Sequence, residues 1–331
     1  MRKIFTLFTF LFLAVSFNSK ATHMMGMDIS YTCLGNNTYH ITLSFYRDCS
    51  GAAQAPTSAD ITASSAICGQ TMTVTLAETV FGIEVSPLCP SQIAQSSCNG
   101  GALPGVQQYV YEGDITLPVA CTDWVIYYEN CCRNAAITNI SGASSYGIRI
   151  EAHIDNTNGL CDNSPVFTTL PVPYICANQP FNYNHGAFDI DGDSLVYTLI
   201  DPMDWLGGAP IPYVFPFSPA YPLSTTSGSV TFSPSTGQMS FTPNATQITV
   251  VAVRVDEYRN GVWVGSTTRD IQLVVLNCNN QVPTVGSPTN ITGGYATGPT
   301  SFEVCPGQPL AFQILGTDPD ASNVLTVLTN L

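Results

Sequence analysis

The sequence predicts an all-β fold of the sandwich type, divided into tandem domains and braced by disulfide bonds. Three observations predict it. Apolar residues recur at every second position in many short segments. Stretches rich in glycine, proline, serine and threonine separate those segments. Twelve cysteines occur in 331 residues. No segment after residue 21 keeps a helical period for three turns, so packed layers of short strands are the expected architecture.

The alternation of apolar and polar residues is clearest in two segments. Each places its apolar side chains on one face of a strand: Ile41, Leu43 and Phe45 in the first, and Ile148, Ile150, Ala152 and Ile154 in the second. Residues 229–243 predict two short strands around a Ser/Gly turn. Residues 248–276 predict two long strands joined at Asn260-Gly261, because this dipeptide favours the tight turns of β-hairpins.

Residues 1–21 predict a secretory signal peptide. Arg2 and Lys3 precede an apolar run, and Ser19 and Ala21 occupy the −3 and −1 positions of a cleavage site. The alternative is a membrane anchor, but the run is shorter than the roughly 20 residues that a spanning helix needs. We expect cleavage after Ala21 and export of the mature chain.

The charge balance of the mature chain excludes several functions. It retains six arginines and no lysine, against 23 acidic residues. Catalysis through a Schiff base or a P-loop requires a lysine amine, so both are excluded. Nucleic-acid binding requires a basic face, and the acidity of this chain opposes it. The same acidity opposes binding to anionic membrane surfaces.

The cysteines of an exported chain predict disulfide bonds. They lie at positions 33, 49, 68, 89, 98, 121, 131, 132, 161, 176, 278 and 305. A zinc site is disfavoured because the sequence has no C-x-x-C pair and no Cys/His cluster with zinc spacing. Spacing alone leaves the connectivity open. Because a bond between adjacent cysteines is strained, we expect Cys131 and Cys132 each to bond a different partner.

A repeat with a period of 129 residues divides the chain. The segments that begin at Cys176 and Cys305 share Gln-Pro three and four residues after the cysteine, and aspartates 13 and 15 residues after it. We expect a cysteine-rich β domain at residues 22–165, a β-sandwich at 166–278 and the start of a second, truncated sandwich at 283–331. The second repeat stops after about two strands, so we expect either the N-terminal part of a longer protein or a truncated gene product.

Four segments resemble the N-terminal region of large secreted Bacteroidota proteins labelled gliding-motility-associated or type IX-secreted. They lie at residues 21–51, 124–140, 164–176 and 251–272 and include the motifs FYRDC, CCRN and EYRNG. The resemblance implies tandem immunoglobulin- or cadherin-like repeats. It also implies export through both bacterial membranes and attachment or release at the cell surface. It implies no catalytic residues.

The segment FDIDGDSLVY carries three carboxylates, Asp189, Asp191 and Asp193, around Gly192. Alternating carboxylates beside a glycine turn can supply the oxygen ligands of calcium, so these three are the candidate metal residues. The alternative is a structural turn in which aspartates accept backbone N–H groups and Gly192 adopts a positive φ. The two interpretations are compatible, and cadherin-like repeats, which the resemblance implies, use calcium to stiffen their junctions.

Other interpretations of this segment are less well supported. An EF-hand is excluded because the residue six positions after the glycine is Thr198 rather than glutamate. A calcium ion would need further ligands, and Asp256, Glu257 and Asp270 on the last hairpin are the expected ones. A catalytic pair is disfavoured because three carboxylates on one turn do not oppose each other across a cleft.

These features predict a non-enzymatic secreted or outer-cell-surface protein of a bacterium. We expect an adhesin or a structural spacer linked to gliding motility, with an unidentified protein or glycan ligand, no nucleic-acid partner, and calcium as the one expected cofactor. The alternative is a carbohydrate-binding or accessory region of a secreted hydrolase. In that case Trp205 or Trp263 would stack on sugar rings, whereas burial in a core is the competing role for each.

Overall fold

The computed structural model describes residues 24–51, 53–157, 159, 161–171, 174–278, 283–298 and 302–320. The predicted signal peptide, residues 1–21, and residues 321–331 of the predicted second repeat lie outside the described residues. The chain forms two compact units, Met1–Leu276 and Asn277–Leu331. In the described ranges, no helix has the length and hydrophobicity needed to cross a bilayer.

The first unit is almost entirely β-structure, which confirms the predicted fold class. Its large, mostly antiparallel sheet contains β1 (Met24–Gly35), β2 (Thr38–Asp48), β3 (Ser58–Ser65), β4 (Gln70–Glu84), β5 (Val106–Thr116), β6 (Trp124–Asn130), β7 (Ile148–Ile154), β9 (Tyr174–Cys176), β12 (Ser194–Ile200), β15 (Gln247–Arg259) and β16 (Val262–Leu276).

Smaller elements complete the first unit. A three-stranded sheet contains β10 (Phe181–Asn184), β14 (Gln238–Phe241) and β13 (Thr231–Phe232), and a two-stranded sheet pairs β11 (Ala187–Phe188) with β8 (Val166–Phe167). The helices of the described residues are short 3₁₀ turns: η1 (Pro90–Gln95), η2 (Ser97–Asn99) and η3 (Ala143–Ser145).

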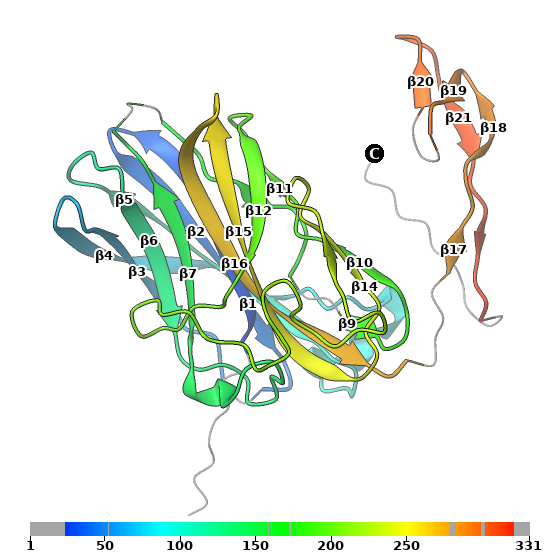
Figure 1. The fold of residues 1–331 in the computed structure, drawn as a ribbon, viewed down its shortest axis with the longest axis horizontal. Coiled ribbons are helices and arrows are strands. Elements are labelled where there is room, and N and C mark those ends of the chain that lie inside the picture. Colours follow the sequence, from blue (N-terminus) through cyan, green and yellow to red (C-terminus); the bar gives the residue numbers. More distant parts are fainter. Residues whose placement is uncertain are drawn as a thin grey trace, which may run out of the picture. The chain divides into compact units, whose positions relative to one another are not determined.

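Strand β16 is central to the large sheet, because it forms hydrogen bonds with other strands along both of its edges (Figure 1). One edge pairs with β15 in the predicted hairpin, which turns at Asn260 and Gly261 with φ angles of 53° and 79°. The other edge pairs in succession with β7 at residues 265–267, β1 at 269–271 and β9 at 274–276. Since β2, β5, β4, β3 and β6 connect β1 back to β7, the hydrogen-bonded path closes on itself.

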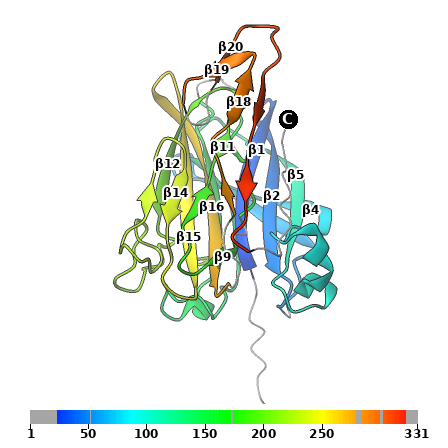
Figure 2. The ribbon, with the colours of Figure 1, turned by 90° about the vertical axis from the view of Figure 1, so that its right-hand side faces the viewer.

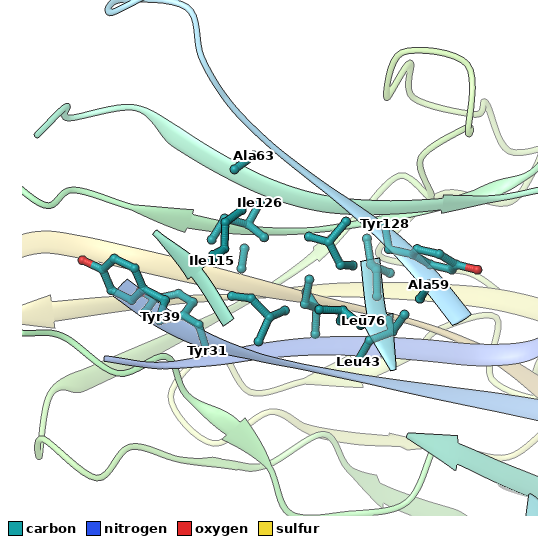
Figure 3. Close-up of a cluster of buried hydrophobic side chains, with 14 of the residues drawn as sticks. Tyr31, Tyr39, Leu43, Ala59, Ala63, Leu76, Ile115, Ile126 and Tyr128 are labelled. Carbon is teal, nitrogen blue, oxygen red and sulfur yellow. The ribbon is translucent and has the colours of Figure 1, made fainter. Parts of the chain in front are cut away.

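The inward faces of β1 to β7 form a first hydrophobic core. The predicted apolar faces are confirmed, because all of their residues are buried: Ile41, Leu43, Phe45, Ile148, Ile150, Ala152 and Ile154. Figure 3 shows Tyr31 and Tyr39 at one end of this cluster and Tyr128 at the other. Burying each such side chain contributes about 1.5–3 kcal/mol, so this core is a main source of stability.

A second core lies between the long hairpin and the three-stranded sheet. The hairpin contributes Val251, Ile271 and Leu273, and the facing sheet contributes Tyr183, Met239 and Phe241. Two sheets that pack face to face define a sandwich. Figure 2 shows β12, β14 and β15 on one side of the unit and β1, β2, β4 and β5 on the other.

The predicted boundary between residues 165 and 166 does not separate two compact units. Each predicted region has its own core, but β16 pairs with β1 and β7 from the first region and with β15 and β9 from the second. A strand that pairs with strands from both regions cannot belong to only one domain, so the two regions fold as one unit. The chain divides after Leu276, beside the predicted boundary at residues 278–283.

Disulfide bonds brace the first unit as predicted. They join Cys33 to Cys161, Cys49 to Cys98 and Cys68 to Cys121. Cys176 and Cys278 are also disulfide-bonded. Two cysteines of the described part of the chain, Cys89 and Cys305, are exposed free thiols, so the predicted disulfide bonds do not include these two.

The prediction that Cys131 and Cys132 bond different partners is wrong. The two bond each other immediately after β6. Their peptide bond is cis and their Cα atoms lie 3.1 Å apart. The bond therefore closes within one dipeptide and leaves neither cysteine to link a distant segment.

The second unit contains three two-stranded pairings among its described residues. β17 (Thr284–Val285) pairs with β22 (Gly316–Thr317), β18 (Thr289–Thr292) with β21 (Ala311–Gln313), and β19 (Gly294–Ala296) with β20 (Phe302–Val304). A shift by the 129-residue period carries β11 onto β22 and most of β10 onto β21. The repeated sequence segments therefore form strands at equivalent positions.

Candidate metal centre

The loop between β11 and β12 is a tight aspartate turn. Asp189 Oδ1 accepts a hydrogen bond from the backbone N–H of Asp193 at 2.9 Å, and Gly192 has a φ of 79°. This is the predicted structural turn, which is confirmed. The turn leaves the second oxygen of Asp189 and the carboxylate of Asp193 available to other parts of the chain.

A second loop, residues 161–164, brings Asp162 to this turn. The disulfide between Cys33 and Cys161 attaches the start of the loop to β1. The Tyr31 N–H donates to Ser164 Oγ at 2.8 Å, and the Ser164 N–H donates to the Tyr31 carbonyl at 3.0 Å. Covalent and hydrogen bonds therefore hold Asp162 in place from both sides.

Arg259, the last residue of β15, is the cation of the cluster. Its guanidinium group lies 2.6 Å from carboxylate oxygens of Asp162 and Asp193 and 3.2 Å from Asp191. Asn163 also donates hydrogen bonds to Asp191, from its backbone and its side chain, at 2.8–3.1 Å. We call Asp162, Asp191 and Asp193 the outer trio, because Arg259 already provides them with a counter-charge.

Glu257 lies two residues before Arg259, on the same face of β15, and is fully buried. Its Oε1 accepts a hydrogen bond from the Tyr31 hydroxyl at 3.0 Å. Asp189, Asp193 and Glu257 offer carboxylate oxygens that all lie within 4.8 Å of one another, and we call these residues the inner trio. Five carboxyl groups therefore gather in one cluster with a single arginine, which contacts Asp162, Asp191 and Asp193.

Burial and repulsion from neighbouring carboxylates disfavour the charged forms of Glu257 and Asp162. Burial, followed by the charge of Asp162, raises the pKa of Glu257 to about 10. Burial also raises the pKa of Asp162 to about 6, although Arg259 opposes this shift. Burial and then Glu257 raise the pKa of the Tyr31 hydroxyl well above its ordinary value. An added cation would reverse this balance, because it favours the ionised carboxylates.

The three residues predicted as metal ligands are divided between the two trios. Asp193 belongs to both, Asp191 belongs to the outer trio and Asp189 to the inner one. Of the further ligands expected on the last hairpin, Glu257 reaches the cluster. Asp270 does not, because it pairs with a buried arginine elsewhere.

Asp256 also lies outside the cluster. It precedes Glu257 in β15, and successive residues of a strand point to opposite faces. Its carboxylate instead accepts hydrogen bonds from Trp263 Nε1 at 3.2 Å and Arg254 Nε at 3.0 Å.

Asp162 and Arg259 belong to the cluster but are not among the residues predicted from the sequence. Strand alternation could have found Arg259, because residues 257 and 259 share a face of the predicted hairpin strand. A weaker signal for Asp162 is its position directly after Cys161, in a loop that a disulfide was expected to anchor. Neither signal indicates by itself which distant carboxylates the side chain meets.

A separate hollow of about 360 Å³ lies on the face of β15 opposite to Glu257. Its lining combines two aromatic rings with polar side chains: His153, Arg254, Asp256, Tyr258, Trp263 and Ser266. The hydrogen bond to Asp256 orients the half-exposed indole of Trp263. Trp205 packs closely against Gly147 instead, so it is not part of this surface.

Comparison with known proteins adds no family assignment. No protein-family model matches the chain, and a search of curated proteins finds no match. The features of the chain that bear on function are therefore the acidic cluster, the hollow around Trp263 and the long-range cross-links of the first unit.

Proposed function

We propose that this chain is a non-enzymatic secreted or outer-cell-surface protein of a bacterium, acting as an adhesin or as a structural spacer linked to gliding motility. The observation that carries the proposal is that covalent and ionic cross-links join distant segments of the first unit. A disulfide, a buried ion pair and a partly buried ion pair each join residues more than 100 positions apart, as their separations of 128, 137 and 241 residues show. Such cross-links restrict unfolding of a domain that works under load.

Two further observations support a location outside the cytoplasm. Structural disulfides form and persist in oxidising compartments. The N-terminal sequence is typical of a signal peptide that directs export. The excess of acidic over basic residues favours solubility and opposes adsorption to anionic surfaces, which suits a protein that extends away from the cell. A calcium ion in the acidic cluster would stiffen the unit further.

The location is tested on intact cells that produce the full chain. We expect antibodies against the first unit to label intact cells or to detect the protein in the medium, and external protease to remove the cell-bound fraction. Detection only after lysis would contradict the proposal. Deletion of the gene is expected to impair attachment or gliding, and the intact gene should restore it.

Carbohydrate binding is a second candidate function, favoured by the hollow around Trp263. An oriented, partly exposed indole beside Asp256 and Arg254 can stack on a sugar ring while polar side chains bind its hydroxyls. We expect glycan binding that Trp263→Ala reduces about tenfold and Trp263→Phe largely retains. Tyr295→Ala, which removes an exposed aromatic side chain from the second unit, is the control. If a glycan array detects no binding by the folded protein, this function is excluded.

A further inference from the structure

We propose that the inner trio binds one calcium ion through Asp189, Asp193 and Glu257, and that Arg259 excludes the ion from the outer trio. This proposal names the ligands of the calcium ion that the proposed function includes. It rests on the proposed function only for the presence of that ion. The location of the protein and its adhesive role are tested separately, so the two proposals can fail independently.

Two buried oxygens of the inner trio have no hydrogen-bond partner among the residues that the structure describes. Asp189 is 8% exposed and Glu257 is 0% exposed. Asp189 Oδ2 and Glu257 Oε2 are buried and, among the residues that the structure describes, accept no hydrogen bond. Leaving a buried carboxylate oxygen without a partner costs free energy that a bound cation would recover. Both oxygens belong to groups that converge within 4.8 Å.

Gly265 leaves space for the buried side chain of Glu257. A Cβ atom at this position of β16 would overlap Glu257 Oε1 and the Tyr31 hydroxyl. Gly265 pairs with Glu257 across the hairpin, where any other residue would displace the glutamate. The sheet therefore accommodates a buried carboxylate at a point where an apolar side chain would otherwise fill the interior.

Positive charge is distributed unequally between the outer trio and the inner trio. Arg259 contacts all three members of the outer trio, and Asn163 donates hydrogen bonds to Asp191 there. Within the inner trio, the arginine contacts Asp193. Electrostatic repulsion by the guanidinium group opposes a second cation in the outer trio, whereas the inner trio keeps uncompensated oxygens.

Calcium fits this donor set better than the other common divalent ions. It accepts six to eight oxygen ligands in irregular geometry, whereas magnesium requires near-octahedral coordination. Zinc prefers nitrogen and sulfur donors in its structural sites. The three carboxylates that the turn and the strand supply form an all-oxygen donor set, which is the kind that calcium prefers. The bound ion would connect the β11–β12 turn to β15.

The test is calcium titration of the mature full chain after treatment with a chelator. Isothermal titration calorimetry should show one site, and terbium should bind there with luminescence sensitised by the nearby Tyr31. We expect Asp189→Asn and Glu257→Gln each to weaken calcium binding about tenfold or more. Asp191→Asn is the matched control, because it removes the same charge from the outer trio, and we expect a change below about threefold.

Three results would overturn the proposal. The first is a folded wild-type protein that binds neither calcium nor terbium at millimolar concentration. The second is a larger loss of affinity for Asp191→Asn than for Glu257→Gln. The third is equal binding of magnesium. Thermal unfolding of each variant in the presence of a chelator shows whether that variant is folded. If Glu257→Gln does not fold, Asp189→Asn decides, because asparagine retains the Oδ1 that accepts the Asp193 N–H.

Discussion

Arg133 and Asp270 form a buried two-point ion pair across 137 residues of the chain. Arg133 Nη1 donates to Asp270 Oδ1 at 3.0 Å, and Nη2 donates to Oδ2 at 2.7 Å. Both side chains are at most 3% exposed. Asp270 lies in the segment of β16 that pairs with β1, so the pair attaches the CCRN segment to the strand that joins the two predicted regions.

Replacement of Asp270 tests this connection. Asp270→Asn leaves the Arg133 guanidinium buried without a counter-charge, and we expect it to lower the free energy of unfolding by about 3–5 kcal/mol. Asp114→Asn is the control, because Asp114 is exposed and its ion pair with His40 lies at the surface; we expect a change within about 1 kcal/mol. Denaturant unfolding measures both, and similar losses for the two variants would contradict the structural role of the pair.

Thiol chemistry tests the disulfide pattern. In the folded, oxidised mature protein we expect alkylation of two cysteines, Cys89 and Cys305, because the structure leaves these exposed thiols free. Peptide mapping without reduction should recover Cys131 and Cys132 in one peptide, lighter by two hydrogens and linked to no other peptide. Either cysteine cross-linked to a distant peptide would show that the adjacent bond does not form.

Acid sensitivity tests the environment of His185. This side chain is fully buried against Tyr183, both ring nitrogens lack a partner among the described residues, and burial lowers its pKa to about 3. Because the folded pKa lies below the unfolded value of about 6.5, the neutral imidazole contributes its full stability above pH 6.5. Stability then falls by about 1.4 kcal/mol per pH unit towards pH 3.

The corresponding variant is His185→Phe, which cannot take up a proton. We expect a shallower loss of unfolding free energy between pH 6.5 and 3.5 than in the wild type. Urea unfolding across this range measures the slope, and the slopes are compared rather than the absolute stabilities. His40→Gln, at an exposed position, should retain the wild-type slope. Identical slopes for His185→Phe and the wild type would show that His185 is not held neutral.

Gly265→Ala tests the close approach at the inner trio. The added methyl group would overlap the Glu257 carboxylate, so we expect a loss of about 1–3 kcal/mol of unfolding free energy and weaker calcium binding. Gly113→Ala on β5 is the matched control, since its nearest neighbour is the flexible end of the Leu76 side chain at 3.0 Å. Stability and calcium affinity unchanged by Gly265→Ala would contradict the assigned packing.

Sequence patterns alone determined the local features of this protein. The buried faces of β2 and β7, the hairpin turn at Asn260-Gly261 and the aspartate turn at residues 189–193 all occur where the patterns predict them. Each depends on residues within a few positions of one another, because alternation and turn preferences are local properties of the backbone. The all-β class follows from the same local signals.

Tertiary structure decided which distant segments meet. It made β16 the strand that pairs with strands from both predicted regions, placed Arg259 against aspartates 66 and 97 positions away, and separated Glu257 from its neighbour Asp256. No local pattern encodes these choices, since pairing between remote strands depends on the combined packing and hydrogen bonding of the whole unit. For this reason the sequence indicated an acidic turn, whereas only the folded unit revealed which carboxylates converge there and which of them Arg259 neutralises.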